Sequence, residues 1–89
     1  MTWNASHARS FEKDLFRLPD ELREQAAKLI RRILENPWIG KKLKGRRNRF
    51  AVRITRDYRI VYSVYKTESL IDFEFAGDRK EAYRWFRHE

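Results

Sequence analysis

Two runs of alternating apolar and polar residues, 50–54 and 58–64, constrain this chain most strongly. Successive side chains of a β-strand point to opposite faces of its sheet, so each run predicts a strand with one apolar face. A turn at residues 55–57 would make these apolar pairs: Ile54 with Tyr58, Val52 with Ile60, and Phe50 with Tyr62. Because every pair on that face is apolar, the alternation predicts a β-hairpin in this register.

A third strand and a last helix are predicted after the hairpin. A second turn at residues 66–69 would bring two sets of apolar residues side by side: Val64, Tyr62 and Ile60 beside Ile71, Phe73 and Phe75. The third strand would end at Ala76, followed by a turn at residues 77–79 and a short helix over residues 80–87. This shared apolar face must pack against the rest of the chain.

The opposite face of the predicted hairpin places Arg53 directly opposite Arg59. Like charges that face each other across a ladder destabilise it unless an anion compensates them. Asp72 and Glu74 fall on the same face and would supply that anion internally; a bound phosphate group is the alternative. The sequence leaves both readings open, and the basic loop at residues 38–48 favours phosphate.

Two helices are predicted before this loop, after a short edge strand at residues 2–5. Ser6 is the expected N-cap of the first helix, whose apolar face carries Phe11 and Leu15. Pro19 and the acidic residues after it start the second helix, and the Asn36–Pro37 step ends it because the residue before a proline disfavours helical dihedrals. With almost no linker between them, the two helices predict a helical hairpin.

The overall charge indicates an anionic partner. The chain has 89 residues, enough for one domain over 1–89, and a net charge of +8. It has no cysteine, and no apolar run approaches the roughly 18 residues of a membrane span. The N-terminus also lacks the basic-then-apolar pattern of a signal peptide. We therefore expect a cytoplasmic protein.

The order of these motifs resembles the RelE/ParE toxin superfamily, specifically its RelE branch of messenger-RNA-cleaving toxins. The resemblance covers nearly the whole chain. It rests on segments 15–19 (LFRLP), 36–37 (NP), 42–45 (KLKG), 50–53 (FAVR), 57–62 (DYRIVY) and 77–83 (GDRKEAY). It implies an α+β fold, in which the N-terminal helical hairpin packs on a small antiparallel β-sheet with a short C-terminal helix.

The resemblance also implies a function. RelE-like toxins cut messenger RNA in the ribosomal decoding site through attack of the 2′-hydroxyl, without a metal or other cofactor. A cognate RelB-like antitoxin neutralises them, and here it would bury apolar residues such as Trp85 and Phe86. ParE-like members of the superfamily poison DNA gyrase instead. A basic RNA-binding domain without catalysis is the third alternative.

Four residues match the functional positions of the family. Arg53 and Arg59 match its strand cations, Arg79 matches an arginine that stabilises the phosphate or helps protonate the leaving group, and Tyr83 matches a tyrosine that orients or deprotonates the nucleophile. Packing of the last helix is the other interpretation of Tyr83. The RNA and the ribosome would be bound by the basic segment: Lys41, Lys42, Lys44, Arg46, Arg47 and Arg49.

Two positions depart from the family pattern. Ala51 stands where the best-known RelE proteins carry a second strand lysine, and Asp78 stands where many members have histidine or lysine. Candidates to replace the missing lysine from the loop are Lys44, Arg46, Arg47 and Arg49.

Overall fold

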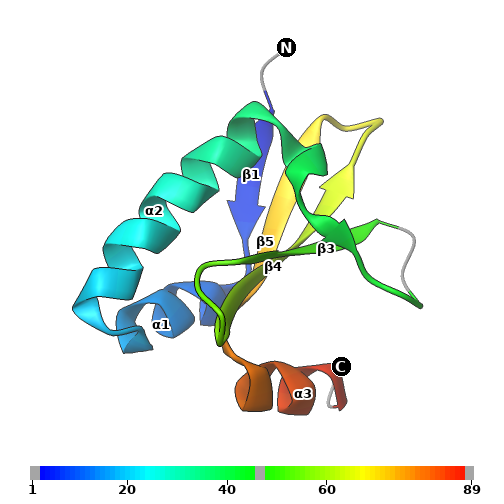
Figure 1. Cartoon of the computed structure of the whole chain (residues 1–89). Helices are drawn as coiled ribbons and strands as arrows, with labels where there is room; N and C mark the ends of the chain where they lie inside the picture. The colour runs from blue at the N-terminus through cyan, green and yellow to red at the C-terminus, as the bar shows by residue number, and fades with distance from the viewer. Residues whose placement is uncertain (1–2, 46–47, 88–89) are drawn as a thin grey trace.

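The computed structural model describes residues 3–45 and 48–87, and it has the predicted α+β fold (Figure 1). The helices are α1 (Arg9–Arg17), α2 (Asp20–Glu35) and α3 (Arg79–Arg87), with a 3-10 turn η1 at Pro37–Ile39. The strands are β1 (Asn4–His7), β2 (Lys41–Lys42), β3 (Arg49–Arg53), β4 (Tyr58–Tyr65) and β5 (Leu70–Asp78). None of the described helices is long and apolar enough to cross a membrane.

The strands form one mixed sheet in the order β1-β5-β4-β3-β2. Strands β2 to β5 pair antiparallel, as predicted, whereas β1 pairs parallel with β5. The edge strand is found at residues 4–7 rather than 2–5. Ser6, the expected N-cap, lies within this strand and its hydroxyl donates to Asp72 Oδ1 at 2.8 Å.

The predicted register of the hairpin is confirmed: Phe50 pairs with Tyr62, and Arg53 pairs with Arg59. The register between β4 and β5 holds only in part. Tyr62 pairs with Phe73, but the pairing then shifts by one residue so that Val61, not Ile60, pairs with Phe75. A β-bulge of this kind reverses the faces of all the residues beyond it. The predicted place of Phe75 on the helical-hairpin face is therefore wrong.

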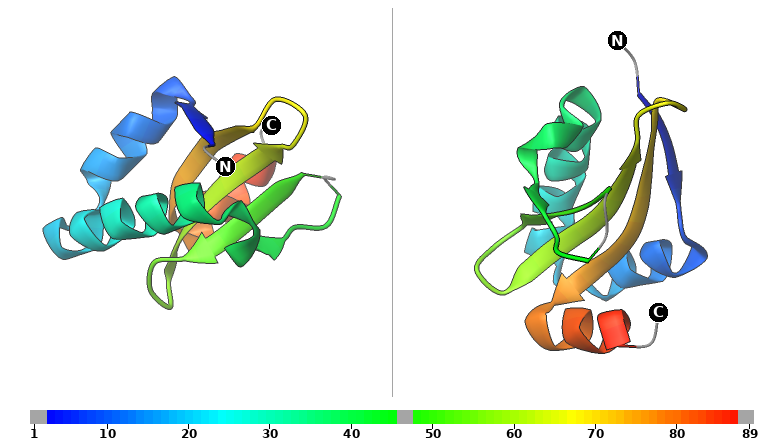
Figure 2. Two further views of the ribbon diagram at one scale, coloured as in Figure 1. Left: turned by 90° about the horizontal axis from the view of Figure 1, so that it is seen from above. Right: turned by 90° about the vertical axis from the view of Figure 1, so that its right-hand side faces the viewer.

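The helical hairpin and α3 lie on opposite faces of the sheet (Figure 2), and an apolar cluster lies on each face. The larger lies between the sheet and the helical hairpin, where Phe11 stacks on Phe73 at a centroid distance of 5.5 Å. The smaller lies under α3 on the opposite face and contains Val61, Phe75 and Ala82. Because of the bulge, the side chain of Phe75 faces α3, and this helix packs on it.

Tyr62 connects the centre of the sheet to the segment after α2. Its side chain is fully buried, and its hydroxyl donates to the Pro37 carbonyl at 2.8 Å and accepts from the Gly40 N–H at 3.1 Å. A Cβ atom at Gly40 would collide with that hydroxyl, which explains glycine at this position. Burial raises the pKa of Tyr62 to about 12. These contacts fix the start of β2 and hence the position of its lysines.

Candidate nucleic-acid interface

Arg53 and Arg59 lie directly opposite each other on the sheet face that carries α3. Arg53 is exposed and Arg59 is half-buried. The Nε atom of Arg59 is buried and has no hydrogen-bond partner among the described residues. Two guanidinium groups that face each other, one of them with an unsatisfied buried donor, favour an anion between or beside them.

The two internal anions considered from the sequence are engaged elsewhere. Asp72 accepts a hydrogen bond from Ser6, on the β1 side of the sheet. Glu74 lies 2.8 Å from Arg49 Nε through one oxygen and accepts from Ser63 Oγ at 3.0 Å through the other. Within residues 3–45 and 48–87, no ion pair joins Arg53 or Arg59 to a carboxylate. Asp72 and Glu74 therefore do not compensate the charges of Arg53 and Arg59, so the internal alternative considered from the sequence is not observed.

The two arginines line a shallow cavity of about 190 Å³ together with residues of β2 and β3. Its other lining residues are Lys41, Leu43, Ala51 and Val52. Lys41 and Lys42 were expected in a loop, but they form the short strand β2, where Lys41 pairs with Ala51 and Lys42 with Phe50. Ala51 thus stands where the family resemblance implies a lysine, and Lys41 lies directly across the ladder from it.

The remaining basic residues of the segment are placed differently from one another. Lys44 is exposed, as are both lysines of β2. Arg46 and Arg47 lie outside the described residues. Arg49 departs from the expectation: it is only 6% exposed and is held by Glu74. This burial argues against the RNA-binding role predicted for Arg49.

The start of α3 lies close to the arginine pair. Arg59 pairs with Gly77, two residues before Arg79, and the Arg79 N–H donates to the Asp57 carbonyl at 3.1 Å. The departure at Asp78 has a structural explanation. Its carboxylate accepts from the Glu81 N–H at 2.8 Å, and the Glu81 carboxylate accepts from the Asp78 N–H at 3.2 Å. This reciprocal capping box sets the first turn of the helix.

Tyr83 lies one turn after Arg79, so both side chains lie on the same flank of α3. The Tyr83 side chain is 74% exposed. The alternative interpretation, in which Tyr83 packs the helix, is therefore not supported; Ala82 and Trp85 make the packing contacts instead. Beside Arg79, a second cavity of about 410 Å³ is lined by Asp57, Tyr58, Asp78, Arg79 and Lys80. We refer to the sheet face that carries α3, with Lys41, Arg53 and Arg59 of the strands and Arg79 and Tyr83 of the helix, as the basic side.

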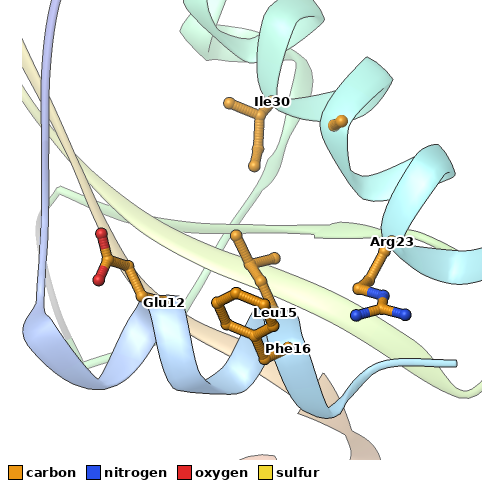
Figure 3. Close-up of a pocket in the computed structure, with 6 residues that line it drawn as sticks. Glu12, Leu15, Phe16, Arg23 and Ile30 are labelled. Atoms are coloured by element: carbon orange, nitrogen blue, oxygen red, sulfur yellow. The ribbon is translucent and has the colours of Figure 1, made fainter. Parts of the chain in front are cut away.

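A separate apolar groove lies between α1 and α2 (Figure 3). It has a volume of about 390 Å³ and is lined by Leu15, Phe16, Ala27 and Ile30, with Glu12 and Arg23 also contributing. Phe16 is 78% exposed, which is unusual for so large an apolar side chain. Phe16 was not among the predicted functional residues, although a phenylalanine one position off the apolar stripe of the first helix is a detectable signal in the sequence.

The family of this chain is identified by its match to a protein-family model. The ParE-like toxin domain matches residues 20–72, which is more than half of the chain. This chain belongs to the ParE-like toxin domain family. Among the described residues of this toxin-family member, no group of three histidine, cysteine or acidic side chains is placed to hold a metal ion. Comparison with curated protein sequences finds no match.

The chain is also similar to solved structures of RelE proteins. The RelBE toxin–antitoxin complex of E. coli matches with 25% identity and a TM-score of 0.76, over 85% of this chain and 95% of that chain. The RelB–RelE antitoxin–toxin complex of Methanococcus jannaschii matches with 28% identity and a TM-score of 0.73, over 91% and 98%. A mutant of E. coli RelE in its free state, at 24% identity, shares the fold with a TM-score of 0.79 over 96% and 92%.

Proposed function

We propose that this protein is the toxin of a toxin–antitoxin pair and that it cuts messenger RNA on the ribosome. One observation carries the proposal: Arg53 and Arg59 face each other on the exposed basic side without a carboxylate partner among the described residues, and the buried Nε of Arg59 is unsatisfied. A phosphodiester is the anion that this arrangement fits, because guanidinium groups bind phosphate oxygens in bidentate fashion.

The proposed reaction is an intramolecular transesterification. A base removes the proton of the 2′-hydroxyl, and the resulting oxygen attacks the adjacent phosphorus. The bond from phosphorus to the 5′-oxygen breaks, and that oxygen takes up a proton. The products are a 2′,3′-cyclic phosphate and a free 5′-hydroxyl. The enzyme must therefore supply a proton acceptor, a proton donor and positive charge around the crowded phosphate.

Two of these roles, positive charge and proton acceptor, fall to residues of the basic side. Arg53 and Arg59 hold the non-bridging oxygens, and Arg79 stabilises the charge that builds up as the leaving oxygen departs. The exposed hydroxyl of Tyr83, on the same flank of α3 as Arg79, orients or deprotonates the 2′-hydroxyl. The exposed lysines of the basic segment, Lys41, Lys42 and Lys44, contact the RNA backbone or ribosomal RNA. The reaction takes place in the cytoplasm, where ribosomes translate.

We also propose that a RelB-like antitoxin neutralises the protein, because the similar E. coli and M. jannaschii proteins were solved as complexes with RelB. Two apolar surfaces are available to such a partner. One is the surface of α3 with exposed Phe86 and half-buried Trp85, which the sequence analysis also proposed, and the other is the groove that Phe16 lines. Covering the groove leaves the basic side open, whereas covering α3 also blocks Tyr83.

Induced expression followed by mapping of messenger 5′ ends tests the proposal. Wild-type protein is compared with Arg59→Met, Arg79→Ala and Tyr83→Phe, and with Arg31→Met as a control, because Arg31 is an exposed arginine on α2 away from the basic side. We expect cuts inside translated frames with the wild type and the control, and none with the three site variants. Growth arrest without cuts would instead indicate a protein target such as gyrase, and neither effect would indicate a binding domain without catalysis.

A further inference from the structure

One of the residues that line the cavity beside Arg53 and Arg59 differs chemically from the others. Six described residues line it: Lys41, Leu43, Ala51, Val52, Arg53 and Arg59. Three are apolar or small, and two are arginines. An arginine guanidinium stays protonated in proteins, so it stabilises charge without transferring a proton. Among these six, Lys41 is the one whose side chain carries a transferable proton.

The position of Lys41 is fixed by the sheet. It pairs with Ala51 across the β2–β3 ladder, and side chains of directly opposed residues lie on the same face with Cβ atoms about 4.5–5.5 Å apart. Ala51 in turn lies two residues before Arg53 on the same face of β3. The hydrogen bond from the Gly40 N–H to buried Tyr62 anchors the residue that precedes Lys41. The small side chain of Ala51 leaves room for the long lysine side chain above it.

The neighbouring lysine provides a contrast within the same strand. Lys42 pairs with Phe50, whose side chain belongs to the cluster under the helical hairpin, so Lys42 lies on the other face of the sheet. It does not line the cavity. Two adjacent lysines of equal charge are thus distinguished by the strand alternation, and only one of them lies beside the arginine pair.

We propose that Lys41 is a catalytic residue that donates the proton to the leaving 5′-oxygen. This inference rests on the proposed nuclease function and adds the proton donor that the arginines do not provide. The departing 5′-oxygen is an alkoxide, which is a strong base, so a lysine ammonium is acidic enough to protonate it. Its N–H bond breaks as the bond from phosphorus to the 5′-oxygen breaks, and a neutral amine remains beside Arg53 and Arg59.

A substrate with sulfur in place of the bridging 5′-oxygen tests this role. A thiolate leaves without protonation, so this substrate does not need the proton donor. Cleavage of ribosome-bound messenger carrying oxygen or sulfur at the cut site is measured in single turnovers with saturating toxin. We expect Lys41→Ala to slow the oxygen substrate about 100-fold or more, the usual scale of general acid catalysis, and to leave the sulfur substrate within about threefold of wild type.

Three comparison variants make the result specific. Lys42→Ala should change both substrates by the same factor, because it lacks the cavity position. Tyr83→Phe should slow both, because it acts on the nucleophile. In the double variant Lys41→Ala/Ala51→Lys the ammonium moves directly across the ladder, and we expect the oxygen substrate to recover at least about tenfold relative to Lys41→Ala.

The outcomes separate the two proposals. If the wild type cuts neither substrate, the nuclease function itself is wrong. If the wild type cuts both and Lys41→Ala slows both equally, the protein is a nuclease but Lys41 only binds RNA. If sulfur restores Arg79→Ala and not Lys41→Ala, the proton is transferred on the α3 side, and the assignment to Lys41 is overturned.

Discussion

Tyr62 shows at the scale of one residue how stability and site geometry depend on the same contact. Its hydroxyl is satisfied by the Pro37 carbonyl and the Gly40 N–H, and burial raises its pKa to about 12. The folded protein therefore holds the phenol proton more tightly than the unfolded chain, in which a tyrosine has its ordinary pKa of about 10. The resulting stability is fully present below about pH 10 and is lost as the pH rises through about 12.

Replacement by phenylalanine tests this linkage. At neutral pH, Tyr62→Phe should lower the free energy of unfolding by about 1–3 kcal/mol, because two backbone groups lose their partner. Between about pH 10 and 12 the wild type should lose about 3 kcal/mol that the variant does not lose, so the difference between them should shrink. Denaturant unfolding at several pH values measures both. A difference that stays constant with pH would contradict the raised pKa.

The sequence predicted charge and pairing at the residue scale better than it predicted burial. The Arg53–Arg59 pair follows from alternation alone, because register depends on a local turn and one apolar face. Arg49 was predicted to bind RNA because it directly follows the basic residues of the loop in the sequence. Its burial depends on Glu74, which lies 25 positions away and reaches Arg49 at the bulge between β4 and β5. Contacts of that range leave no local pattern in one sequence.

Helix α3 is the element whose position depends most on a few contacts. It has nine residues, fewer than an isolated helix needs to be stable in water, and only Ala82 among them is buried. Its capping box holds the first turn. Further along, Trp85 stacks on Phe75 with centroids 5.4 Å apart, and the Arg49 guanidinium carbon lies 4.8 Å from the Trp85 ring centroid. Arg49 therefore connects the start of β3 to the helix that carries Tyr83.

Substitution of Arg49 by lysine should loosen α3 selectively. Lysine keeps the positive charge near Glu74 but lacks the planar group that stacks on Trp85, and a desolvated cation–π contact is worth about 2 kcal/mol. We expect backbone hydrogen exchange of α3 to rise about tenfold, while exchange of β4 stays unchanged. Arg31→Lys, on an exposed face of α2, is the matched control. Equal protection of α3 in wild type and Arg49→Lys would show that the stacking contact does not hold the helix.

The elements themselves were mostly predictable, and the exceptions have a common cause. The end of α2 at Glu35 follows from the Asn36–Pro37 step, and the last helix from its composition. The parallel pairing of β1 and the bulge at Glu74 were not predicted, because both depend on which segments meet in three dimensions. Without the bulge, Phe75 would face the helical hairpin and α3 would have no aromatic surface to pack on.

On the scale of the whole molecule, the apolar groove and the basic side are formed by different elements. Phe16 and Ile30 belong to the helical hairpin, whereas Arg53 and Arg59 lie on the sheet face that carries α3. Arg23 lines the groove, and exposed Arg17 and Lys28 directly follow the lining residues Phe16 and Ala27 in the sequence. A partner helix with one apolar face and acidic flanks therefore fits the groove, and an antitoxin held there need not touch Arg53 or Arg59.

Together with the proposed function, this separation predicts a variant that resists its antitoxin but keeps the proposed RNA cleavage. Phe16→Ala removes the most exposed apolar side chain of the groove, and truncation of an aromatic anchor at an interface typically costs about 2 kcal/mol or more. We expect affinity for the cognate antitoxin to fall at least about tenfold, with cleavage by the free toxin unchanged.

Lys13→Ala, an exposed change on α1 outside the groove, should alter neither the antitoxin affinity nor the cleavage. Calorimetry of purified toxin and antitoxin, paired with single-turnover cleavage, measures the two effects. If Phe16→Ala binds like the wild type while Trp85→Ala and Phe86→Ala lose affinity, the antitoxin acts on α3, and inhibition then requires displacement of the helix that carries Tyr83.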